Sequence, residues 1–249
     1  MTVTILKLGG SVITDKDRDE TLDAAALEAA AADVGRALEA GHVDDLVIAH
    51  GGGSFGHVHA SEHGVSTTDG SHDVDAVHDI HGAMKTLNAF VLERLLEAGI
   101  PAVPVHPLSV GARDASGELT FPAGQIATML EEGFVPVVHG DVIVHRGAGV
   151  TIVSGDELVT ELATALEVER IGLCSTVPGV LDGDGAVIER IERYGDVETV
   201  LGASESTDVT GGMAAKVRAL LELEGQAAIF GPDDLGAFLE GRGPGTTIG

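Results

Sequence analysis

The sequence has few lysines, almost no cysteine and few aromatic residues. Its 249 residues include four lysines, one cysteine, one tyrosine and no tryptophan. With Cys174 alone, no intramolecular disulfide can form, and its apolar neighbours indicate a buried strand residue in a reducing compartment. No stretch approaches the roughly 20 apolar residues of a membrane-spanning helix, and no basic leader precedes the first apolar run. We therefore expect a soluble, cytoplasmic protein.

Lysine and arginine together are scarce. The chain carries 14 basic and 40 acidic residues, a formal net charge of −26. This charge argues against nucleic acids and anionic membranes as partners, because both would be repelled. The protein would also repel itself in dilute buffer, whereas at 1 M salt the screening length falls to about 3 Å. We therefore expect a halophilic source.

Strand-like and helix-like segments alternate along most of the chain, and several strands run directly into glycine turns. This order predicts an α/β fold, a three-layer αβα sandwich with a mainly parallel central sheet. In such folds ligands bind at the carboxyl ends of the strands. The expected strands are residues 2–8, 45–50, 101–105, 170–174 and 226–230, and the expected helices are 22–40, 82–98, 156–167 and 212–223.

The middle of the chain interrupts this alternation. A turn lies at 114–117, and two short apolar segments, 135–139 and 142–145, flank Gly140-Asp141. This pattern favours β-hairpins that project from the main sheet. Because no linker or change of composition divides the chain, we expect one domain over residues 1–249.

Glycine turns occur at three places, and lysines accompany two of them. Gly9 and Gly10 follow Lys7, the triplet 51–53 follows the second strand, and Lys216 lies in the first turn of a helix that begins with glycines. Consecutive glycines let backbone N–H groups turn toward one anion, and ammonium groups add charge. The turns match neither a Walker A loop nor the complete dinucleotide-binding pattern. A different phosphate-binding fold is therefore expected.

Each of three features has two possible interpretations. Asp156 either caps the helix that follows it or separates two lysine side chains. His57, His59 and His63 have spacings that a metal site could use, but no acidic or cysteine partner completes the motif, and the segment also fits a solvated lid before the helix at residue 82. A set of apolar side chains fits either a ligand pocket or ordinary core packing: Val77, Ile80, Met84 and Leu87.

Together these features resemble the amino acid kinase superfamily and, within it, the isopentenyl phosphate kinases. His57, which ends the second glycine loop, is the residue that resembles the branch that phosphorylates a phosphate group. The matching motifs span nearly the whole chain: Lys7 to Ser11 with Lys16, His50 to His57, His139-Gly140-Asp141, Ser154-Gly155-Asp156, and Asp208 to Met213 with Lys216.

The resemblance implies ATP-dependent phosphorylation of isopentenyl phosphate to isopentenyl diphosphate, in an alternative mevalonate pathway of archaea. A phosphate monoester is already a nucleophile, so the enzyme needs no general base and has only to align and neutralise two anions. Mg²⁺ would accompany ATP, with no metal bound by the protein itself. The resemblance also implies a homodimer.

Residue roles follow from the same resemblance. Lys7 and Lys216 would contact the ATP phosphates, Lys16 would stabilise the transition state, and Asp156 would orient lysines. His57 would bind the acceptor phosphate. Further nucleotide contacts would come from Gly9, Gly10, Gly52, Thr176 and Gly211, and further acceptor contacts from Gly51, Gly52, Gly140 and Gly155. The acceptor part would cover roughly residues 1–165 and the nucleotide part roughly 166–249.

One segment departs from the family pattern. Residues 175–179 read Ser-Thr-Val-Pro-Gly, where members often have Thr-Asp-Val-Asp-Gly. The contacts of Thr176 with the nucleotide are therefore open, and backbone groups would hold the adenosine if no aspartate is needed. Kinases of acetylglutamate, carbamate, UMP or fosfomycin share the scaffold. A nucleotide-binding module without turnover is the alternative outside the enzymes, and the retained Lys7, Lys16 and Lys216 argue against it.

Overall fold

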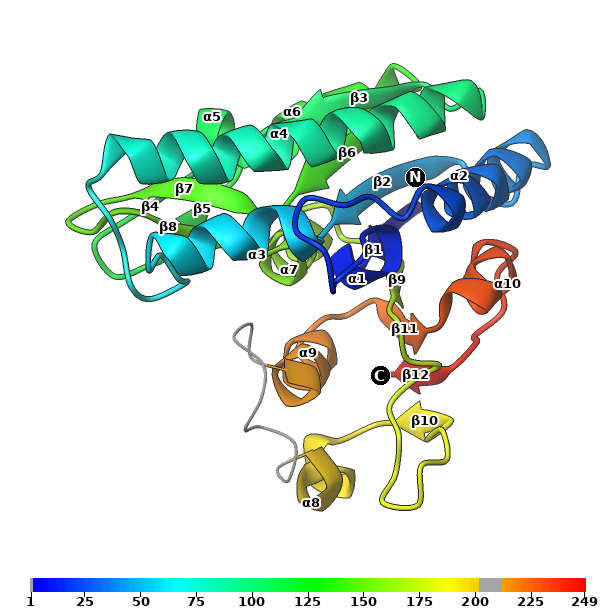
Figure 1. Ribbon diagram of the computed structural model, residues 1–249. Coiled ribbons are helices and arrows are strands. Elements are labelled where there is room, and N and C mark those ends of the chain that lie inside the picture. Colours follow the sequence, from blue (N-terminus) through cyan, green and yellow to red (C-terminus); the bar gives the residue numbers. More distant parts are fainter. Residues whose placement is uncertain (1, 202–211) are drawn as a thin grey trace.

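The computed structural model describes residues 2–201 and 212–249 and has two sheets (Figure 1). The central sheet has eight strands in the order β10-β12-β11-β9-β1-β2-β6-β3, and all except β10 and β12 run parallel to one another. Its strands are β1 (Val3–Leu8), β2 (Asp45–His50), β3 (Ala102–Val105), β6 (Val135–His139), β9 (Arg170–Cys174), β10 (Arg190–Ile191), β11 (Gln226–Phe230) and β12 (Thr246–Ile248).

Helices cover both faces of the central sheet. Side chains alternate along β1, so that Ile5 packs into one apolar cluster with α6, α7 and α9, while Leu6 and Leu8 pack into another with α2, α4 and α10. The predicted three-layer α/β class is confirmed. The helices are α1 (Gly10–Ile13), α2 (Ala24–Glu39), α3 (Gly53–Glu62), α4 (Val74–Glu97), α5 (Pro107–Val110), α6 (Ala123–Glu131), α7 (Gly155–Ala165), α8 (Glu198–Leu201), α9 (Gly212–Leu221) and α10 (Leu235–Leu239).

The second sheet is small and lies beside one end of α4 (Figure 1). It contains β5 (Leu119–Thr120), β4 (Ala112–Arg113), β7 (Asp141–His145) and β8 (Gly149–Val153), in that order. Projecting β-hairpins were expected from this region, but the pairing of 135–139 differs from the expectation. Val135–His139 is β6 of the central sheet, fully buried between β2 and β3, and β7 pairs with β8 instead.

The histidine-rich segment also differs from its expected form. Residues 53–62 form the helix α3, so only the residues that follow it make a loop. The next helix, α4, begins at Val74 rather than near Gly82, because Asp73 caps it by accepting the N–H of Asp75. Among residues 2–201 and 212–249, no helix is both long and apolar enough to cross a bilayer.

Candidate active site

A cleft of about 640 Å³ lies at the carboxyl ends of β1, β2, β6 and β9. The segments that follow these four strands form much of its wall, together with the start of α7. Gly9 and Gly10 follow β1, the triplet 51–53 follows β2, Gly140 follows β6, and Ser175 follows β9. Two of the predicted glycine turns, at 9–10 and 51–53, therefore meet in one place.

The first two glycine turns pack backbone against backbone. A Cβ atom on Gly10 would lie 2.6 Å from the Cα of Gly53, and one on Gly51 would lie 2.8 Å from the N of Gly10. Gly53 also has a φ of +49°, in the region that favours glycine. Side chains at these positions would force the two turns apart.

The backbone N–H groups of the second turn have different partners. The N–H of Gly51 donates to the carbonyl of Leu8, and Ser54 donates to the hydroxyl of Thr14. Within the described residues no acceptor takes the N–H groups of Gly52 and Gly53, which open α3. The N–H groups of Gly52 and Gly53 are therefore the ones suited to bind an anion, whereas the N–H of Gly51 is already bonded to β1.

Asp156 lies between two ammonium groups. Its carboxylate is 2.6 Å from Lys7 Nζ and 3.7 Å from Lys216 Nζ. Burial alone would raise the pKa of Asp156, but the two lysines outweigh burial and hold the pKa below its usual value. The helix cap is Ser154, which accepts the N–H of Glu157. The interpretation of Asp156 as the cap is therefore wrong, and the carboxylate joins lysines from β1 and α9.

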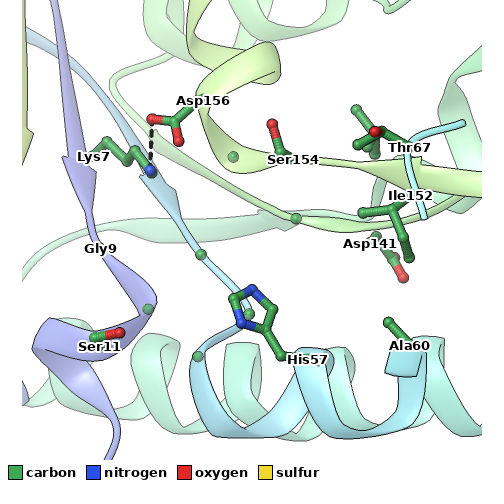
Figure 2. Close-up of a pocket in the computed structure, with 18 of the residues that line it drawn as sticks. Lys7, Gly9, Ser11, His57, Ala60, Thr67, Asp141, Ile152, Ser154 and Asp156 are labelled. Atoms are coloured by element: carbon green, nitrogen blue, oxygen red, sulfur yellow. Dashed lines mark hydrogen bonds and ion pairs between the residues drawn. The ribbon is translucent and has the colours of Figure 1, made fainter. Parts of the chain in front are cut away.

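His57 reaches from α3 into the cavity, with Lys7 and Asp156 across it (Figure 2). The two other histidines of the predicted metal spacing point elsewhere. His59 lies 2.5 Å from Glu20, and His63 lies 2.8 Å from Asp79. In the part of the chain that the structure describes, no three His, Cys, Asp or Glu side chains form a group able to hold a metal ion.

Several other predicted site residues are spread over different places. Thr176 lines the cleft, as do Gly140 and Gly155. Lys16 is exposed on the loop between α1 and α2 and lies outside the cleft lining. Gly211 lies outside the described residues, as do the preceding residues of its motif.

One end of the cleft contains several apolar side chains. Ala60 and Ile152 lie there, away from Gly9 and Ser11, with Thr67 and the carboxylate of Asp141 beside them (Figure 2), and Ile80 and Met84 also line the cleft. Ile80 and Met84 are each 1% exposed and pack into apolar clusters as well, so core packing holds for both, and a role in a ligand pocket stays a prediction. Leu87 is fully buried in the core, and Val77 packs against a small cluster beside β7 and β8.

Two polar pairs near the cleft were missed by the sequence interpretation. Asp141 is 1% exposed and lies 2.7 Å from Nδ1 of His81, and burial raises the pKa of its carboxyl group. Arg113 from β4 lies 2.6 Å from Glu157 in the first turn of α7. The motif His139-Gly140-Asp141 offered a signal for Asp141, whereas nothing local marks Arg113.

The comparisons with known proteins identify the family of the chain and agree with its fold. Residues 2–229 match the model of the amino acid kinase family. An isopentenyl phosphate kinase of Haloferax volcanii is 59% identical over 248 residues, covering 100% of this chain and 99% of that protein. One of Methanothermobacter thermautotrophicus is 36% identical, covering 88% and 86%. A solved isopentenyl phosphate kinase structure matches with a TM-score of 0.82 at 31% identity, covering 99% of this chain and 100% of that one.

The chain therefore belongs to the amino acid kinase family, a class of small-molecule kinases that share one α/β scaffold. Within that family it belongs to the isopentenyl phosphate kinases.

Proposed function

We propose that this protein transfers the γ-phosphoryl group of ATP to isopentenyl phosphate, giving isopentenyl diphosphate and ADP. The observation that carries the proposal is the construction of one cleft. It has a histidine on α3, a lysine–carboxylate–lysine group across from that histidine, and an apolar end between them and the second sheet. A substrate with a phosphate head and a short hydrocarbon tail fits those three parts.

The chemistry requires positioning and charge neutralisation more than proton transfer. The acceptor is a phosphate anion, which attacks the γ-phosphorus directly without losing a proton to a base. Two anions must approach each other in a protein with a net charge of −26. Lys7, Lys216 and the N-terminus of α7 supply local positive potential there, and this potential offsets the repulsion.

Different sets of residues bind the two substrates. ATP phosphates lie against Lys7, Lys216 and the turn at Gly9 and Gly10, with Gly52 at the boundary. The nucleoside lies near Thr176, which follows β9 in the cleft wall. Asp156 pairs with both lysines and holds the two ammonium groups close together.

The acceptor phosphate lies on the other side of the reacting centre. His57 and the N–H groups that open α3 bind it, and Gly140, Gly51 and Gly155 form the cleft wall beside it. The hydrocarbon tail extends toward Ile80, Met84 and Ile152. Burial of a five-carbon chain in that end contributes roughly 0.8 kcal/mol per CH₂ group.

Mg²⁺ enters as part of the MgATP substrate. The two aspartates of the cleft lining are already engaged, Asp156 by lysines and Asp141 by His81. The ion is therefore held by phosphate oxygens and water rather than by a protein cage. We propose further that the protein acts in a salt-rich cytoplasm, which its strongly acidic composition supports. The resemblance to the family is the ground for proposing a homodimer.

A coupled assay of ADP release at high salt tests the reaction. Isopentenyl phosphate should support turnover, whereas acetylglutamate, carbamate and UMP should not. His57→Ala should raise the KM for isopentenyl phosphate at least about tenfold, because a charge-assisted hydrogen bond to phosphate is lost. The KM for ATP should stay within about twofold.

His63→Ala is the matched control, since His63 pairs with Asp79 at the end of α3 and does not line the cleft. Its kinetics should equal those of the wild type. Turnover with a different acceptor, or unchanged kinetics in His57→Ala, would count against the proposed reaction or against the role of His57, respectively.

A further inference from the structure

Four histidines form a continuous group beneath the cleft, and the proposed phosphoryl transfer uses none of them. The rings of His50 and His139 stack with centroids 5.4 Å apart, and His106 and His81 continue the row at 5.2 and 5.9 Å. His50 and His139 are 0% exposed. They are the last residues of β2 and β6, so each directly precedes a glycine of the cleft wall.

The His50 ring contacts the backbone of the next residue. Its Nδ1 lies 3.1 Å from the carbonyl oxygen of Gly51. Two lone pairs would face each other at that distance unless Nδ1 carries the proton, so Nδ1–H donates to Gly51. Burial lowers the pKa of His50, and the ring is therefore neutral with an acceptor at Nε2.

Asn88 is the group that meets this acceptor. The Asn88 side chain, 0% exposed on α4, has its amide oxygen 3.1 Å from His50 Nε2, and its Nδ2 has no partner among the described residues. A half-turn of the amide preserves its shape and places the NH₂ group against Nε2. His50 Nε2 and Asn88 Nδ2 are then hydrogen-bonded to each other, and the proton of His50 is fixed on Nδ1.

His139 repeats the arrangement with a different partner. Its Nδ1 lies 2.9 Å from the carbonyl oxygen of Gly140, and its Nε2 lies 2.9 Å from Nδ1 of His106. Burial brings the pKa of His139 well below its usual value, so this ring is neutral too. His106 therefore donates to Nε2, and the proton of His139 is fixed on Nδ1.

These two bonds set the direction of the peptide groups that face the cleft. In a trans peptide the C=O and the following N–H point in opposite directions. A Gly51 carbonyl held by the buried ring of His50 therefore turns the N–H of Gly52 away from the core. The carbonyl of Gly140 is held by His139, while its N–H donates to the backbone of His50 at 3.0 Å. Both peptides are thus fixed by neutral imidazoles.

We propose that Asn88 and His106 are positioning residues that fix the tautomers of His50 and His139, so that the His50 ring orients the peptide whose Gly52 N–H binds the acceptor phosphate, and the His139 ring holds the Gly140 carbonyl in the cleft wall beside it. This inference rests on the proposed function for its substrate, but the ring tautomers exist without substrate. The two can therefore be tested separately.

Substitutions at His106 test the effect on the acceptor. His106→Phe keeps a planar ring without the donor, and His106→Asn keeps an amide nitrogen close to the place of Nδ1. We expect His106→Phe to raise the KM for isopentenyl phosphate about five- to tenfold, because the variant loses one hydrogen bond. The KM for ATP should be unchanged. His106→Asn should restore the KM to within about twofold of the wild type. An unchanged acceptor KM in His106→Phe would overturn the proposal.

Long-range ¹H–¹⁵N spectra of the histidine rings read the tautomers directly, in the wild type and without substrate. His50 and His139 should both carry their proton on Nδ1. In Asn88→Asp, the carboxylate accepts only, so the proton of His50 should appear on Nε2. A wild-type protein with Nε2–H tautomers would sink the inference even if every substituted variant failed to fold. Absence of turnover with isopentenyl phosphate alongside Nδ1–H tautomers would instead remove the proposed function.

Discussion

At the scale of single residues, the lysines separate by their surroundings. Lys7 and Lys216 are tied to Asp156 inside the cleft, whereas Lys16 is exposed on the loop that follows α1. That loop is attached to α3, because Glu20 donates its backbone N–H to Ser54 and contacts His59 through its carboxylate. Lys16 is therefore carried by a segment joined to the helix of His57.

We predict that Lys16→Ala lowers kcat by about tenfold or more and leaves both KM values within about twofold, because charge on the transferred group must be met most strongly in the transition state. Steady-state kinetics with each substrate varied in turn measure the split. Lys85→Ala removes another exposed lysine, on α4 and outside the cleft lining, and serves as the control. A raised KM for ATP at unchanged kcat would show that Lys16 binds the ground state instead.

At the scale of elements, the close approach of two turns makes one glycine essential and leaves another replaceable. A Cβ on Gly10 meets the backbone of Gly53, which has nowhere to move, whereas a Cβ on Gly82 in the middle of α4 meets nothing within 4 Å. Gly10→Ala should therefore cost about 1–3 kcal/mol of unfolding free energy through strain and should reduce activity. Gly82→Ala should add about 0.5–1 kcal/mol through helix propensity.

Urea unfolding at constant high salt, followed by circular dichroism, measures both changes. The pair is matched, because each variant adds one methyl group to a glycine near the start or middle of a helix. Equal stabilities for the two variants would contradict the proposed packing of the turns.

The strands and helices that the sequence predicted correctly are those with strong local signals. Buried β-branched runs that end at a glycine turn, as at 2–8 and 45–50, mark a parallel strand without knowledge of its neighbours. The segment 135–139 has the same apolar character, but the nearby strand Asp141–His145 suggested a hairpin. Its actual neighbours, β2 and β3, are far away in the chain, and local pattern carries no information about such pairing.

The residues of the site likewise divide into those with a local sequence signal and those without one. Lys7, Asp156 and the glycine turns were found because each lies in a short motif. The group of His50, His81, His106 and His139 draws on β2, α4, β6 and the segment after β3, so only the folded structure brings it together. Seven of the 11 histidines lie between residues 50 and 81, and this concentration pointed to a lid or metal rather than to buried rings.

At the scale of the whole molecule, surface charge and buried histidines have opposite effects on the stability of the folded protein as the pH falls. With 40 acidic residues, protonation of carboxylates relieves self-repulsion as the pH falls. Burial lowers the pKa of His50, His106 and His139 below the ordinary 6.5, so these rings resist protonation in the folded state. High salt screens the first effect and has little influence on the second.

The sign of the histidine effect follows from proton uptake. As the pH falls through about 6.5, the unfolded chain binds protons at these three positions and the folded protein does not. Stability is therefore complete above that pH and decreases below it, by at most about 1.4 kcal/mol per pH unit for each ring. His59, whose pKa is raised by its bond to Glu20, and Asp141, whose pKa is raised by burial, act in the opposite direction. The partly exposed His59 pair is screened by salt, and Asp141 is a single carboxyl group set against three buried rings.

We therefore predict that, at about 2 M salt, the melting temperature falls steadily as the pH is lowered from about 7.5 to about 5.5. Scanning calorimetry across that range measures the slope. His139→Asn removes one titrating ring and should give a shallower slope, whatever its effect on stability at neutral pH. A melting temperature that rises with acid under screened conditions would mean that the carboxylates, and not the buried imidazoles, govern the acid response of this protein.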